Sequence, residues 1–131
     1  MTTTILIPGS PVAQARPKFF RCGRGVGAYN PQRDEVKRFQ AVAFPQIREA
    51  VPEKTPLTVD CRFYMPIPAS WAKKKQADPG EHTSAPDIDN LMKYVLDALN
   101  GRAWKDDRQI TYVTAVKMYS TEPRTEIVLS W

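Results

Sequence analysis

The feature that most constrains the fold is a strict alternation of apolar and polar residues in LTVDCRFYMPI, residues 57–67. A period of two matches a β-strand, whose successive side chains point to opposite faces of a sheet. The apolar positions are Leu57, Val59, Cys61, Phe63 and Met65, and the alternate positions are Thr58, Asp60, Arg62 and Tyr64. This segment is therefore predicted to be a strand that buries one of its faces.

Two segments have apolar residues three or four apart, which is the spacing of one face of a helix. They are residues 32–50, with Val36, Phe39, Ala43 and Ile47, and residues 90–100, with Leu91, Val95, Ala98 and Leu99. Pro45 is expected to kink or divide the first helix, because proline lacks the amide hydrogen and clashes with the preceding turn. Asp89 is placed to cap the second helix and Gly101 to end it.

Shorter strands are predicted at residues 5–8, 18–22 and 27–30, and Ser70 is placed to cap a short helix that carries lysines. Residues 109–120 and 125–131 are two further strands, adjacent in sequence and expected to pair. This mixture predicts an α+β fold of two layers, a mixed β-sheet with helices packed on one face. The length is that of one domain, so residues 1–131 are predicted to form a single domain.

The chain has 19 Lys and Arg against 14 Asp and Glu, a formal net charge of +5, and its cations are unevenly distributed. Seven of them lie in residues 1–38 against two acidic residues, and a second cluster lies in WAKKKQ, residues 71–76. Such patches favour phosphate backbones, because each neutralised phosphate releases condensed counterions. A solvated surface explains the charge equally well, so charge alone leaves both interpretations open.

Several kinds of site are disfavoured by the residues that the chain lacks. Cys22 and Cys61 are far apart and neither belongs to a CxxC pair, so no zinc or redox motif is indicated. The single histidine, His82, leaves little room for a Ser-His-Asp triad. An enzyme of this sequence is therefore expected to use carboxylates. No secretory signal and no membrane-spanning stretch is indicated, which predicts a cytoplasmic protein.

Five aspartates gather in PDIDNLMKYVLDALNGRAWKDDRQI, residues 86–110. Asp87 and Asp89 are two residues apart at an extended entry to the helix, so their side chains can point to the same side. Lys93 and Asp97 each follow the preceding charge by four residues, which places them on the helix face opposite the apolar stripe. These spacings predict one charged face along the helix.

Asp106 and Asp107 precede the next predicted strand, and one of them can return to the first pair if that strand packs beside the helix. Converging carboxylates repel one another, and a hard divalent cation removes that cost. The pattern thus favours a metal site inside a phosphate-binding surface. Each aspartate alone is also typical of a helix cap, a solvated helix face or a turn, so a purely structural role stays open.

Residues 86–110 closely resemble the signature of RusA-type Holliday junction resolvases, endodeoxyribonucleases common in prophages. The segment has the D-x-D-N pair, the lysine one helical turn later, the DALNG helix end and the DD pair at matching separation. RPKFFRCGRGVGAYNP is similar to the basic N-terminal ribbon of that family, and FYMPIPASWAKKKQA to its strand and lysine-rich helix. The likeness covers most of the chain.

The resemblance implies that Asp87, Asp89 and Asp107 bind Mg²⁺ or Mn²⁺, with Asp106 as a neighbour of this set. It implies that Lys93 is the catalytic lysine, which stabilises developing charge or orients the attacking water. The expected enzyme is a homodimer that hydrolyses two opposed strands of a four-way DNA junction. The residues expected to hold the DNA backbone are Arg16, Lys18, Arg21, Arg24, Lys73, Lys74 and Lys75.

Two other functions stay open at this point. One is a non-catalytic basic DNA-binding module, in which the aspartates only cap and solubilise, and the other is a metal nuclease that acts on flaps or plain duplex. The aromatic residues Trp71 and Phe20 lie beside cations and are as compatible with stacking on bases as with packing. Trp104 is expected to pack in the core.

Overall fold

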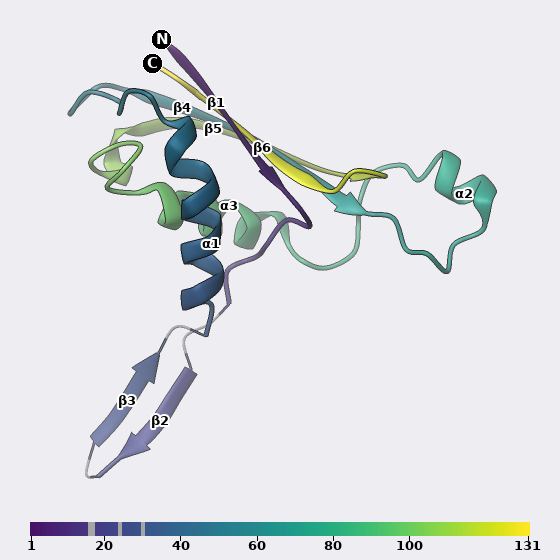
Figure 1. Cartoon of the computed structure of the whole chain (residues 1–131), viewed down its shortest axis with the longest axis horizontal. Coiled ribbons are helices and arrows are strands. Elements are labelled where there is room, and N and C mark those ends of the chain that lie inside the picture. Colours follow the sequence, from purple (N-terminus) through teal and green to yellow (C-terminus); the bar gives the residue numbers. More distant parts are fainter. Residues whose placement is uncertain (16–17, 24, 30) are drawn as a thin grey trace.

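The computed structural model describes residues 1–15, 18–23, 25–29 and 31–131, with the backbone alone for 18–20 and for 28–29. Its main sheet has four strands in the order β1-β6-β4-β5 (Figure 1). The strands are β1 (Thr2–Pro8), β4 (Leu57–Pro66), β5 (Ile110–Ser120) and β6 (Arg124–Ser130). Strand β6 is antiparallel to β1 and β4, whereas β4 and β5 are parallel. The predicted mixed sheet is therefore confirmed.

The predicted pairing of the last two strands is wrong, because β4 lies between them. Thr58 of β4 is aligned with Ser130 of β6 on one side and with Tyr112 of β5 on the other. Residues 121–123 therefore cross the end of β4, spanning the roughly 10 Å between strands that are two apart. Adjacency in sequence does not establish pairing here, since the turn is long enough to pass over one strand.

Helices cover one face of this sheet, as the sequence predicts (Figure 1). They are α1 (Arg33–Ala43), the short 3-10 helix η1 (Phe44–Gln46) and α3 (Ile88–Leu99). The predicted division of the first helix is confirmed, because α1 ends at Ala43 and Pro45 lies within η1. The expected extension of that helix to residue 50 is wrong, since η1 ends at Gln46.

The core lies between these helices and the sheet. All five apolar side chains of β4 are buried, which confirms the predicted half-buried strand; they are Leu57, Val59, Cys61, Phe63 and Met65. In the same core cluster α3 contributes Leu91, Val95 and Leu99, each at most 1% exposed. Burial of one such side chain stabilises the fold by about 1.5–3 kcal/mol, so this contact fixes α3 against the sheet.

Two segments project away from the layered part (Figure 1). One is an antiparallel ribbon of β2 (Lys18–Cys22) and β3 (Gly25–Tyr29), which confirms two extended segments about a turn. The other carries α2 (Lys73–Ala77), between β4 and α3. The predicted Ser70 cap is wrong, because the N-cap of α2 is Ala72, and Gln76 Nε2 instead donates to the Trp71 carbonyl at 2.6 Å. No helix within the described residues is long and apolar enough to span a membrane.

The two thiols differ in accessibility and provide a test of the buried strand. Cys22 is exposed, whereas burial, aided by the charge of Asp60, raises the pKa of Cys61 to about 12. Because the thiolate is the reactive form, we expect a thiol reagent at pH 8 to modify only one cysteine of the native protein. Both should react in denaturant, and Cys22→Ser should leave no fast thiol. Rapid modification of Cys61 in the folded protein would contradict the position of β4.

Candidate active site

Two of the predicted acidic residues lie at the beginning of α3. Asp87 is the N-cap, with an extended backbone at φ −69° and ψ 146°, and Asp89 lies in the first turn. The expectation that Asp89 caps the helix is therefore wrong, because α3 begins at Ile88. The Asp87 side chain accepts no capping hydrogen bond within the described structure, so its carboxylate is not engaged by the helix end. The partial positive charge of a helix N-terminus favours both anions.

Asp87 and Asp89 line one open pocket of about 560 Å³ between the start of α3 and strand β5. Both residues are exposed. The remaining lining residues are Glu81, His82, Ile88, Ala115, Val116 and Lys117. The structure thus brings the first acidic pair together in a place that a ligand can enter.

His82 and Lys117 are the two basic side chains of this pocket. Lys117 Nζ donates to the Ser84 carbonyl at 2.7 Å and to the Pro86 carbonyl at 2.8 Å. The His82 ring is 9% exposed and lies 4.7 Å from the Tyr119 ring, and its Nδ1 has no partner among the described residues. Burial and the charge of Lys117 lower the pKa of His82. Its imidazole is therefore neutral at physiological pH.

The remaining charges of α3 follow the predicted face. Asp89, Lys93 and Asp97 are all exposed, whereas the stripe on the opposite side is buried. Lys93 lies one helical turn, roughly 6 Å, beyond Asp89. The helix ends as expected, since Asn100 is the C-cap and Gly101 follows with a φ of +85°, a conformation that favours glycine.

Asp107 is anchored by a core side chain. It begins the 3-10 helix η2 (Asp107–Gln109), and the indole Nε1 of Trp104 donates to its Oδ1 at 2.7 Å. Trp104 is only 1% exposed, which confirms its predicted packing role. The indole therefore holds this carboxylate from a rigid position beside the end of α3.

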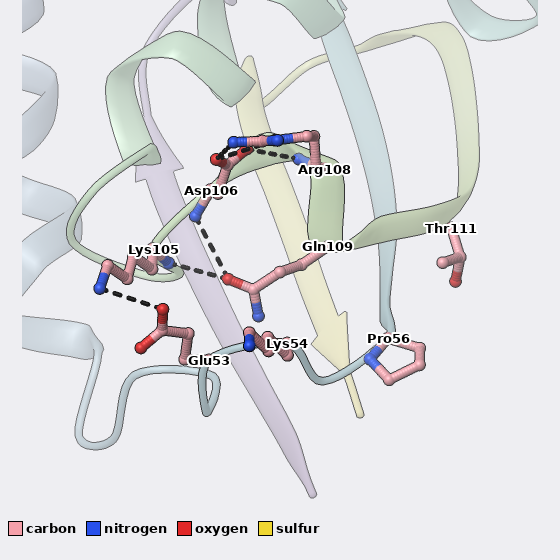
Figure 2. Close-up of a pocket in the computed structure, with 8 residues that line it drawn as sticks. All are labelled: Glu53, Lys54, Pro56, Lys105, Asp106, Arg108, Gln109 and Thr111. Carbon is pink, nitrogen blue, oxygen red and sulfur yellow. Dashed lines mark hydrogen bonds and ion pairs between the residues drawn. The ribbon is translucent and has the colours of Figure 1, made fainter.

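The turn that carries Asp107 is closed by a reciprocal capping box (Figure 2). Asp106 Oδ1 accepts from the Arg108 amide at 2.9 Å, and the Asp106 amide donates to Gln109 Oε1 at 3.2 Å. Gln109 Nε2 also donates to the carbonyls of Pro52 and Thr55, at 2.8 and 3.2 Å. Hydrogen bonds from Arg108 lower the pKa of Asp106. The adjacent aspartates therefore have different partners, and Asp106 holds the turn.

Asp107 lies closer to the second half of α3 than the sequence suggested. Burial and, second, the negative charge of Asp107 raise the pKa of Asp97, and Lys93 opposes this shift. Asp97 is eight residues beyond Asp89, about 12 Å along the helix axis. No three His, Cys, Asp or Glu side chains of the described residues come close enough to hold a metal ion. The convergence of Asp87, Asp89 and Asp107 on one ion therefore stays a prediction.

The basic residues expected to contact DNA are only partly described. Lys73, Lys74, Lys75 and Arg21 are exposed. Arg16, Arg24 and the side chains of Lys18 and Phe20 lie outside the described residues. Trp71 packs against Tyr119, with ring centroids 4.8 Å apart, and Lys75 Nζ lies 4.1 Å from the Trp71 ring centroid. These contacts attach the α2 segment to the end of β5; stacking of Trp71 on a base stays a prediction.

Comparison with known proteins shows the family of the chain. The model of the family Endodeoxyribonuclease RusA matches residues 8–130, which include every predicted site residue. The chain belongs to this family. It is therefore an endodeoxyribonuclease, and the family implies Holliday junction resolution. The chain is also 35% identical over 128 residues to the Uncharacterized protein YqaN of Bacillus subtilis (strain 168), an alignment that covers 92% of this chain and 90% of that protein.

Sequence reasoning missed three neighbours of the site: Asp97 beside Asp107, and His82 and Lys117 beside the first acidic pair. For Asp97 a signal existed, because its spacing of four from Lys93 puts both on one helix face. For His82 and Lys117 there was none. Their position depends on β5 lying beside the start of α3, which local spacing does not reveal.

The Trp104 anchor can be tested with Trp104→Phe, which keeps an aromatic ring but removes the indole donor. A hydrogen bond to a charged group contributes about 1.5–3 kcal/mol, and solvent around the half-buried Asp107 places the expected stability loss near the lower end. Because the indole orients the Asp107 carboxylate, we expect RusA junction cleavage to fall at least about tenfold, as when the partner that orients a metal ligand is lost. Trp131→Phe, a matched change at the C-terminus, should retain activity. Equal cleavage by both variants would refute the anchor.

Proposed function

We propose that this RusA protein is a Mg²⁺-dependent resolvase that acts as a homodimer and hydrolyses one phosphodiester in each of two opposed strands of a four-way junction. The observation that carries the proposal is the pair of exposed carboxylates, Asp87 and Asp89, in one open pocket at the positive end of α3. Neither carboxylate forms an ion pair among the described residues. The lysine that lines the pocket beside them, Lys117, is bound to backbone carbonyls.

The donor set fits a hard divalent cation. Mg²⁺ binds oxygen ligands and typically takes one or two carboxylates, with waters and substrate phosphates completing its shell. In the proposal Asp87 and Asp89 hold Mg²⁺ or Mn²⁺, and Asp107 supplies the third carboxylate of the same acidic face. A bound ion would supply positive charge to the scissile phosphate and favour ionisation of the attacking water.

Lys93 is proposed to act on the same phosphate. It lies on the face of α3 between Asp89 and Asp97, so its ammonium stands between the acidic pair and the Asp97–Asp107 pair. A primary ammonium in this position can donate to the oxygens on which negative charge develops, or orient the attacking water. Charge neutralisation between the carboxylates also lets them approach one another.

The homodimer follows from the symmetry of the proposed substrate. Two opposed strands of a junction are related by a twofold axis, and a twofold dimer presents one equivalent site to each. The basic ribbon and the α2 segment project from the sheet layer, and both are proposed to hold phosphates outside the pocket (Figure 1).

The central test is a cleavage assay on a fixed four-way junction, a flap and a linear duplex, with Mg²⁺ and at equal concentrations. We expect Asp89→Asn to bind the junction but to cut it about a hundred- to a thousandfold more slowly, as when a catalytic electrostatic group is removed. Glu49→Gln, which removes one exposed negative charge after η1, should cut normally. Products should carry a 5′-phosphate and a 3′-hydroxyl. Faster cutting of the flap or the duplex would reject the junction assignment, and full activity of Asp89→Asn would reject the metal pair.

Whether α2 contacts DNA phosphates can be tested separately, by measuring how the affinity for DNA depends on salt concentration. Replacing Lys73, Lys74 and Lys75 with Gln should flatten the plot of log affinity against log salt, by up to about 0.9 for each phosphate that the variant no longer neutralises. The cleavage rate at saturating DNA should stay near that of the wild type. Lys105→Gln, in the connection between α3 and β5, should leave the slope unchanged. An unaltered slope in the triple variant would show that α2 does not contact the DNA backbone.

A further inference from the structure

The side chain of Lys117 connects β5 to the segment that leads into the acidic pair. Lys117 is aligned with the buried Phe63 of β4, so it projects from the face of the sheet that carries the helices. Both of its side-chain hydrogen bonds within the described residues go to main-chain carbonyls, those of Ser84 and Pro86, at 2.7 and 2.8 Å. The second carbonyl belongs to the residue immediately before Asp87.

From this geometry we propose that Lys117 is a positioning residue that holds Asp87 in its metal-binding place. This inference rests on the proposed function. On its C-terminal side Asp87 is fixed by α3, which the buried Leu91 and Val95 attach to the core. On its N-terminal side the chain has no regular structure, and Lys117 bridges two of its carbonyls, which are two residues apart. Two bonds to one ammonium fix both the position and the direction of the backbone as it enters the helix.

The segment that leads into α3, residues 81–86, runs alongside β5 and contacts it at several points. Glu81 forms an isolated antiparallel bridge with Met118, and the His82 amide donates to the Lys117 carbonyl at 3.4 Å. Lys117 therefore binds the segment with its main chain and again, a few residues later, with its side chain. Among the contacts of the described residues, these side-chain bonds are the last attachment of the segment before Asp87.

The same ammonium also has an opposing electrostatic effect, because its charge repels a cation in the pocket. Two observations favour positioning as the stronger effect. The charge is bound to two carbonyl oxygens, whose partial negative charge offsets it, and the pocket is open to water, which weakens interactions between separated charges. Removing Lys117 should therefore weaken metal binding, whereas dominant repulsion would make the binding tighter.

Calorimetric titration of the DNA-free protein with Mn²⁺ and Mg²⁺ tests whether removing Lys117 weakens or tightens metal binding. Lys117→Met keeps most of the length of the side chain but removes the donors, and we expect about a tenfold loss of metal affinity, the usual effect of losing a residue that orients a ligand. Lys117→Arg can donate to both carbonyls and should recover most of the affinity. Lys105→Met, at an exposed lysine that pairs with Glu53 at 3.1 Å, is the matched control and should bind like the wild type.

Hydrogen exchange separates this inference from the proposed function. Exchange of residues 83–89 should accelerate in Lys117→Met but not in Lys117→Arg or Lys105→Met. Unchanged exchange, or unchanged or tighter metal binding by a folded Lys117→Met, overturns the positioning role. If the wild type binds no metal, the proposed function fails, and the exchange comparison still decides whether Lys117 holds the segment. If Lys117→Met does not fold, Lys117→Gln takes its place in both measurements.

Discussion

The packing of α3 against the apolar face of β4 is the contact on which the rest of the site depends. Because β4 is central and buries every apolar side chain of its alternating stretch, α3 has a fixed place on the sheet. Strand β5 then lies parallel to β4 at the sheet edge, which brings Lys117 to the start of α3. Trp104 fills the core at the other end of the helix and holds Asp107 there. One buried surface thus positions both acidic groups.

The charged side chains of α3 lie on its exposed face and include carboxylates close to one another. Asp87 and Asp89 line one open pocket, and in a second pair burial and then the negative charge of Asp107 raise the pKa of Asp97. Lys93 lies between the pairs on the same helix face. Carboxylates that approach one another repel, and proteins tolerate local conflicts of this kind mainly at functional sites. The divalent cation proposed for this face would offset the repulsion and allow the carboxylates to lie beside a DNA phosphate.

Local patterns in the sequence predicted the helices and strands that are set by the spacing of apolar residues or by a proline within the same segment. The alternation of residues 57–67 became β4, the helical stripe became α3, and Pro45 divided the first helix. Predictions that required knowledge of a boundary or a partner were less reliable. Asp87 and not Asp89 caps α3, Ala72 and not Ser70 caps α2, and β4 separates two strands expected to pair. Capping depends on where the backbone leaves the extended conformation, and several residues near a helix start are equally suitable in sequence.

By itself the sequence determined the period of each main element, the charged face of α3 and the signature that identifies the family, because these depend on fixed spacings along the chain. Only the tertiary structure decided which side chains lie beside the aspartates: Lys117 and His82 near Asp87, Trp104 on Asp107, and Asp107 near Asp97. The physical reason is that these contacts depend on strand order and register. Both are set by burial across the whole core, and residues distant in sequence meet only once that core has formed.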